Sequence, residues 1–230
     1  MKGTAALFQY QFEFGPVLEN LPFLLRAVGV TLQVMAYAWV LSLVIGIIAG
    51  QLRLSHYRWV RLIATAYIDF FRTTPLLVQL VWIFYVIPII FGIRTTDFQS
   101  GVLALSLNYG AFFAEVFRAG VTSIGRGQSE AGSALGMTTL QVLYRVVYPQ
   151  AIRRMLPPLG SMTVSLLKDT ALVSVIGIQD LMNAAQNLTA QTFRPLEVLT
   201  TVAIIYFLLT YPIAWISDYF HKRNVLSHAA

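Results

Sequence analysis

Long apolar stretches separated by short charged segments run through most of the chain. Four stretches contain no charged residue and measure 26, 21, 17 and 20 residues; they lie between Arg26 and Arg53, Arg72 and Arg94, Asp97 and Glu115, and Glu197 and Asp218. A helix needs about 20 mostly apolar residues to cross roughly 30 Å of hydrocarbon. The pattern therefore predicts four transmembrane helices.

A fifth stretch runs for 25 residues from Met155 to Gln179 and is interrupted only by Lys168 and Asp169. We count it as a span and predict an all-α integral membrane protein with a single transmembrane domain over residues 1–230. The expected spans are 22–50, 67–92, 98–120, 158–180 and 198–219, with a long loop over 121–157 between the third and the fourth.

Composition agrees with this interpretation, since 57% of the residues are hydrophobic and 11% are charged. Positive residues collect beside the loops on one side, ten against four on the other. Because Lys and Arg favour the cytoplasmic side, we expect the N-terminus outside and the C-terminus in the cytoplasm of a bacterial inner membrane. This topology accounts for the net charge of +6, and no nucleic-acid partner is needed to explain it.

The sequence lacks the residues and motifs that several kinds of metal site and active site require. The chain has no cysteine, and its three histidines fall in a loop or the tail, so we expect no metal site. None of its three lysines follows the glycine run of a P-loop, and the metalloprotease and serine-hydrolase motifs are missing. We therefore expect no enzyme, no catalytic residue and no cofactor.

The long loop over 121–157 contains the clearest local sequence signals. Ser129 is placed to cap a helix beginning at Glu130, and Gly136 permits a break. A second helix is expected from about Thr138 to Pro149, which lacks a backbone donor. One interpretation is an interfacial amphipathic helix whose apolar face meets lipid, through Leu140, Leu143, Tyr144 and Val147.

The same loop supports a second interpretation. Glu130, Ala131, Gly136 and Pro149 match the spacing E-A-A-x3-G-x9-I-x-L-P, with Gly132, Val146 and Tyr148 as departures. This resembles the EAA loop of membrane subunits of bacterial ABC importers. The segments FFRTTPLLVQL (70–80), NYGAFFAEVFRAG (108–120) and LLKDTALVSVIG (166–177) are similar to the polar amino acid permease family of the histidine and glutamine type.

The resemblance implies a permease that moves polar amino acids while a separate ATPase hydrolyses ATP. Its expected partners are two copies of a cytoplasmic ABC ATPase, a second permease subunit, and an extracytoplasmic amino-acid-binding protein. In such a system Glu130, Ala131 and Gly136 form the coupling helix that enters the ATPase.

Charges inside the fourth span indicate where a substrate binds. Ser161, Ser165, Lys168 and Asp169 fall on one helical face. A charge near the bilayer centre costs about 2.5–3.5 kcal/mol, so this face should meet protein or a wet cavity. A zwitterionic amino acid needs both a cation and an anion, which makes Ser165, Lys168 and Asp169 candidate substrate ligands; a structural ion network is the alternative.

The third span offers Asn108 as a deeper neutral ligand and Glu115 nearer the inner surface. Glu115 is expected to pair either with Arg118 one turn away or with Lys168 across the bundle, and the sequence leaves both open. In the second span Asp69 and Arg72 are spaced for an intrahelical ion pair.

A different function class also remains, namely a secondary transporter or channel that works without ATP. Five spans divide poorly into the inverted repeats of such folds.

Overall fold

The computed structural model describes residues 10–226, with side chains up to Tyr219. Within this range all regular secondary structure is helical. The helices are α1 (Gly15–Glu19), α2 (Leu21–Arg53), α3 (Arg58–Thr73), α4 (Leu76–Phe91), α5 (Asp97–Thr122), α6 (Arg126–Ala134), α7 (Thr139–Val142), α8 (Tyr148–Asp169), α9 (Leu181–Thr192) and α10 (Pro195–Leu226). A π-helical turn (Leu143–Val147) joins α7 to α8, and a 3-10 helix (Thr170–Ile176) follows α8.

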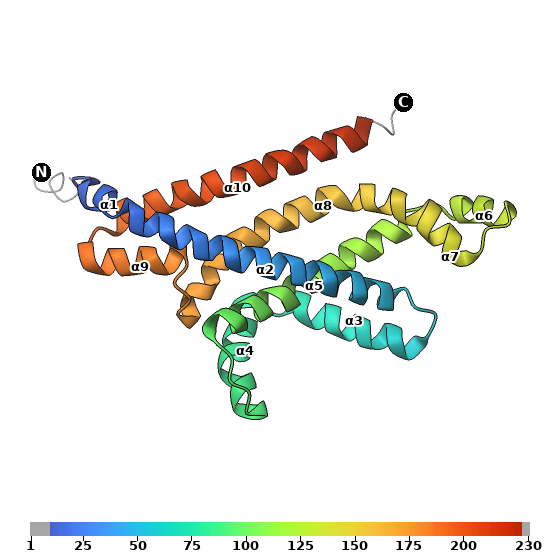
Figure 1. Cartoon of the computed structure of the whole chain (residues 1–230), viewed down its shortest axis with the longest axis horizontal. Coiled ribbons are helices and arrows are strands. Elements are labelled where there is room, and N and C mark those ends of the chain that lie inside the picture. The colour runs from blue at the N-terminus through green and yellow to red at the C-terminus, as the bar shows by residue number, and fades with distance from the viewer. Residues whose placement is uncertain (1–9, 227–230) are drawn as a thin grey trace, which may run out of the picture.

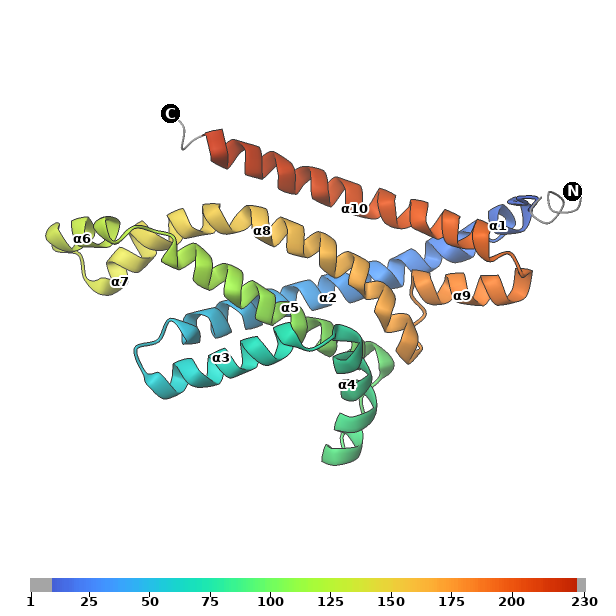
Figure 2. The same ribbon diagram turned by 180° about the vertical axis from the view of Figure 1, so that it is seen from behind.

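Four helical stretches are long and apolar enough to span a membrane, and a fifth span results if the bent pair α3 and α4 is counted as one. The chain is therefore an all-α membrane protein of four or five spans. Figures 1 and 2 show α2, α5, α8 and α10 running along the long axis, while α4 leaves the bundle at a steep angle.

Small residues bring α2 and α5 together at the centre. Ala38, Ser42, Gly46 and Gly50 form a buried stripe on α2. A Cβ added to Gly46 would lie 2.5 Å from the Cβ of Phe113, so only glycine allows this approach. The stripe of small residues thus allows the close packing of α2 on α5.

The second predicted span, 67–92, contains a sharp break. α3 and α4 meet at an angle of 107° around Thr74 and Pro75. Thr74 is extended, with φ −92° and ψ 143°, because a residue before proline is pushed out of the helical region. The span is therefore two half-helices.

The second helix of the loop between α5 and α8 does not end where the sequence suggested. Pro149 was expected to end it, and that expectation is wrong: the π-helical turn passes into α8, which places Pro149 in its first turn. The π-helical turn just before Pro149 accommodates the missing donor and the ring, so the helix continues through this residue.

Different helices lie at the two ends of the molecule. α1, α9 and the start of α10 gather at one end, and the α2–α3 connection lies with α6 and α7 at the other (Figures 1 and 2). At the first end the Glu197 carboxylate, fully buried, accepts hydrogen bonds from the Tyr10 hydroxyl at 2.5 Å and the Glu13 backbone N–H at 3.0 Å. These bonds fasten the described N-terminal residues to α10.

Candidate functional site

Asp169 lies where α8 gives way to the 3-10 helix, and its side chain is half-buried against α5. The Tyr109 hydroxyl, on a side chain that is 3% exposed, donates a hydrogen bond to Asp169 Oδ2 at 2.7 Å. Across residues 10–219 no cation lies within ion-pair distance of this carboxylate. The second carboxylate oxygen therefore keeps capacity for a ligand.

Lys168 points to a different neighbour, an open groove of about 310 Å³ between the end of α8, α9 and α10. The groove is lined by Ala171, Met182, Leu199, Val202, Ala203 and Tyr206 in addition to the lysine. Lys168 is exposed and makes no ion pair with any residue in the described part of the chain. An exposed ammonium at this depth requires water, protein or a ligand beside it.

The remaining polar residues of this face are bonded within α8. Ser165 is exposed, and its hydroxyl donates to the Ser161 carbonyl at 3.2 Å. Such a bond to the preceding turn leaves the hydroxyl oxygen able to accept from a ligand. Ser165 and Lys168 thus share an exposed face, while Asp169 turns toward α5.

Asn108 has a different environment from the one expected of a ligand. It is 4% exposed, and its amide nitrogen donates to the Phe71 carbonyl at 2.9 Å and to Gln79 Oε1 at 3.1 Å. The Gln79 amide nitrogen in turn donates to the carbonyls of Phe71 at 3.0 Å and Thr74 at 3.1 Å. We call these two side chains, Gln79 and Asn108, the amide clasp. It satisfies carbonyls at the end of α3 that Pro75 cannot serve.

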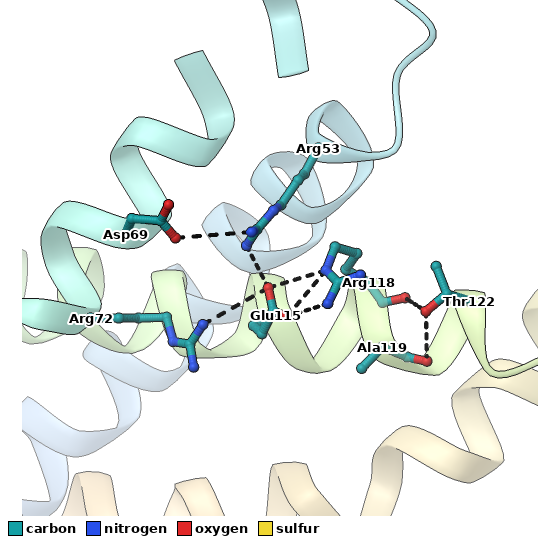
Figure 3. A network of polar contacts seen from close by, with 7 residues as sticks. All are labelled: Arg53, Asp69, Arg72, Glu115, Arg118, Ala119 and Thr122. Atoms are coloured by element: carbon teal, nitrogen blue, oxygen red, sulfur yellow. Dashed lines mark hydrogen bonds and ion pairs between the residues drawn. The ribbon is translucent and has the colours of Figure 1, made fainter. Parts of the chain in front are cut away.

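Glu115 is the centre of a charged cluster at the junction of α2, α3 and α5 (Figure 3). Its carboxylate pairs with Arg118 on the same helix, with Arg53 at 2.5 Å and with Arg72 at 3.9 Å. Of the two pairings left open by the sequence, the one with Arg118 forms. Asp69 contacts Arg53 at 3.9 Å, so the ion pair expected between Asp69 and Arg72 is replaced by pairs to other helices.

The five candidate ligands therefore occupy three environments. Ser165, Lys168 and Asp169 lie together at the end of α8, Asn108 belongs to the amide clasp, and Glu115 to the charged cluster. Sequence reasoning missed Tyr109, Gln79 and Arg53, whose partners are on other helices. The only signal for Tyr109 was its place beside Asn108 in a polar segment of an apolar span.

The loop between α5 and α8 forms a short helix, a bend and a longer helix. α6 begins at Arg126 after Gly125, so the predicted Ser129 cap is wrong; Ser129 lies inside the helix, which starts earlier than expected. Gly136, at φ +79°, ends it as predicted. The N–H of Met137 bonds the Gly132 carbonyl at 3.1 Å and that of Gly136 bonds the Ser133 carbonyl at 3.0 Å, which is a Schellman motif.

Several residues of this loop face outward. Glu130, Ala131 and Gly136 are all exposed, and Leu135 is 79% exposed. The four residues of the alternative lipid-facing stripe do not share one surface. Leu140 and Tyr144 are exposed. Val147 and Leu143 belong instead to the buried cluster that contains Ile124 and Met155. The apolar spacing there serves internal packing as well as the surface.

Comparison with known proteins identifies the family of this chain. Residues 42–225 match the family of binding-protein-dependent transport system inner membrane components. The chain belongs to this family. The match covers α5, the loop that follows it, α8 and the charged cluster within one contiguous range.

Individual relatives are similar over nearly their whole length. The glutamine transport system permease protein GlnP of Escherichia coli K12 is 34% identical over 215 residues, covering 93% of this chain and 98% of the relative. The crystal structure of an amino acid ABC transporter with histidines is 34% identical, with a TM-score of 0.86, and covers 93% of this chain and all of that one. The MetNI methionine ABC transporter in inward facing conformations shares the fold at 20% identity and a TM-score of 0.69, covering 91% of this chain and 98% of that one.

Proposed function

We propose that this chain is the permease subunit of an ATP-driven, binding-protein-dependent importer of polar amino acids. The observation that carries the proposal is the near full-length similarity to a glutamine permease and to an amino acid ABC transporter. The chain itself carries no P-loop, so ATP hydrolysis requires a partner chain.

That partner is an ABC ATPase, present in two copies, which binds the cytoplasmic loop. An exposed short helix with apolar residues beside it suits a helix-in-groove contact. Glu130, Ala131 and Gly136 enter the groove, and Leu135 supplies apolar area at its edge. Closure of the ATPase around this helix moves α8, because the loop continues into α8 through the π-helical turn.

A second permease subunit, either a copy of this chain or a close homologue, covers the face that carries the bend between α3 and α4. Broken backbone is tolerated at membrane depth only where protein or a wet cavity adjoins it. α4 carries exposed apolar residues there, among them Trp82 at 48% and Ile89 at 81%. An extracytoplasmic binding protein delivers the amino acid to the opposite end from the cytoplasmic loop.

The amino acid binds at the end of α8. Asp169 accepts the substrate ammonium, Lys168 binds its carboxylate, and Ser165 adds a neutral hydrogen bond. The support for this assignment is that both charges lack an ion partner within the described range. The contacts of Asn108 and Glu115 favour structural roles, holding the bend and the charged cluster respectively.

Reconstitution tests the function. Proteoliposomes holding this permease and its partner ABC ATPase should take up labelled L-glutamine or another polar amino acid only when ATP and the binding protein are both supplied. Lys168→Met should reduce uptake while the complex still assembles and hydrolyses ATP. Uptake driven by a proton or sodium gradient through this chain alone would instead establish the secondary-transporter alternative.

A further inference from the structure

We propose that Tyr10, Phe12 and Phe14 form an aromatic anchor that binds the bilayer at the boundary between headgroups and hydrocarbon. We call these three residues the aromatic ladder. They lie at the end of the molecule that carries α9, and their side chains are 44%, 62% and 38% exposed. An exposed group of large apolar side chains marks a surface that meets a partner or a membrane. The inference lies outside the transport site and does not depend on how the amino acid binds.

The rings of the ladder share one side of the chain. The ring centroids of Tyr10 and Phe12 lie 5.2 Å apart, edge to face, and those of Phe12 and Phe14 lie 6.1 Å apart, stacked. Contacts between residues two apart are those of an extended segment, whose alternate side chains point the same way. Between two of these rings, Glu13 pairs instead with Arg194 at 2.5 Å. The segment therefore has one aromatic face and one polar face.

The polar contacts hold this segment against the start of α10. The Tyr10 hydroxyl and the Glu13 N–H donate to the buried Glu197 carboxylate at 2.5 and 3.0 Å. The Arg194 guanidinium also donates to the Gln11 carbonyl at 3.2 Å. A buried carboxylate is costly unless it is hydrogen-bonded, so Glu197 favours the bound position of the segment. The ladder is thus kept in one place while its rings stay exposed.

The position of the ladder beside two spans identifies lipid as its partner. The carboxylate that holds it, Glu197, lies in the first turn of α10, and the span of α10 begins at Pro195. The short helix α1 joins the ladder to α2, whose span begins at Leu21. Because the ladder contacts the start of one span and closely precedes the other, it lies where hydrocarbon meets headgroups. Aromatic side chains are enriched at this boundary.

Exposed apolar side chains continue from this level along both spans. They are Phe23 and Leu25 on α2, and Leu196 and Leu199 on α10. The ladder therefore extends an apolar surface that two membrane-spanning helices already present to their surroundings. This continuity favours the bilayer over a water-soluble protein as the occupant.

Phe193 supplies a further aromatic group from a distant part of the sequence. It ends α9 with φ +53°, a left-handed conformation that is strained for a residue with a bulky side chain, and it is 85% exposed. Its neighbour Arg194 is the residue that contacts the ladder segment. A ring so exposed gains little from packing within the described part of the chain. Contact with lipid gives it a role beside the ladder.

Single nitroxide labels test the anchor, since the chain has no native cysteine. Phe12→Cys and Phe14→Cys are labelled separately in the full-length permease with its partner subunits, in nanodiscs of phosphatidylethanolamine and phosphatidylglycerol. Oxygen concentrates in hydrocarbon and a nickel chelate stays in water, so their collision rates with the label report immersion. We expect the oxygen-to-nickel ratio at positions 12 and 14 to exceed severalfold that of Gln11→Cys, the matched control on an exposed neighbour.

Four outcomes would overturn the anchor. Low ratios at all three positions would place the ladder in water, and high ratios at all three would remove its one-sided character. Protection of position 12 from both reagents would mean that another subunit covers it. If purified binding protein lowers the collision rates of both reagents at position 12, that protein is the partner and the bilayer is not.

Discussion

Gly136 has the most demanding backbone conformation in the loop between α5 and α8. Its φ of +79° lies in the left-handed region, where a side chain costs about 1–2 kcal/mol. Two hydrogen bonds of the Schellman motif depend on that conformation. A larger residue therefore changes the direction in which the chain leaves α6, and with it the surface offered to the ATPase.

We expect Gly136→Leu to lower substrate-stimulated ATPase activity of the assembled complex severalfold, because the helix offered to the ATPase is misdirected. Gly127→Ala is the control, since that glycine lies inside α6 with open space around it and should tolerate a methyl group. Normal coupling in Gly136→Leu would show that the loop does not transmit ATPase closure.

At the residue scale, prediction succeeded where the cause was local. Glycine as a helix stop is a property of one backbone position, so the break at Gly136 was readable. The partners of Glu115 beyond its own helix were not, because Arg53 and Arg72 come from two other helices and their distances depend on how those helices cross. The hydrogen bonds of Asn108 could not be foreseen for the same reason: they go to a break whose geometry the sequence does not state.

At the scale of elements, the bend between α3 and α4 is held by the amide clasp. Gln79 is 5% exposed and donates to the Phe71 and Thr74 carbonyls. Leaving buried carbonyls unsatisfied costs about 1–3 kcal/mol. The clasp therefore determines whether the half-helices keep their angle.

We expect Gln79→Leu to lower the unfolding temperature of the purified permease by several degrees, since about 2–4 °C corresponds to 1 kcal/mol in a chain of this size. Gln186→Leu is the control, because Gln186 is an exposed amide on α9. Equal unfolding temperatures for wild type and Gln79→Leu would mean that other groups satisfy the bend.

Element length and number followed from apolar runs, because a bilayer requires them. Whether a predicted span is one unbroken helix could not be predicted from the apolar runs. Pro75 breaks one predicted span by 107°, whereas Pro149 lies in the first turn of α8 and breaks nothing. The same residue type acts differently because the residue before Pro75 is extended, whereas a π-helical turn precedes Pro149 and keeps that helix continuous.

At the scale of the whole molecule, the arrangement of the ends bears on topology. The α2–α3 connection lies at one end with α6 and α7, and α9 lies with the N-terminal helix at the other (Figures 1 and 2). The excess of basic residues beside the first of these ends favours placing it in the cytoplasm. The binding protein would then meet the end that carries α9.

Cysteine labelling tests this orientation in cells, and the absence of native cysteine makes the experiment direct. Single cysteines at Arg58 and Gln128 should be shielded from an impermeant thiol reagent added outside, while one at Gln186 should react. All three positions are exposed, so a difference in labelling reports the side of the membrane and not burial within the chain. Permeabilised cells provide the control, in which all three should react equally. Outside labelling at Gln128 would place α6 on the wrong side for a cytoplasmic ATPase, and the coupling role of Glu130, Ala131 and Gly136 would have to be abandoned.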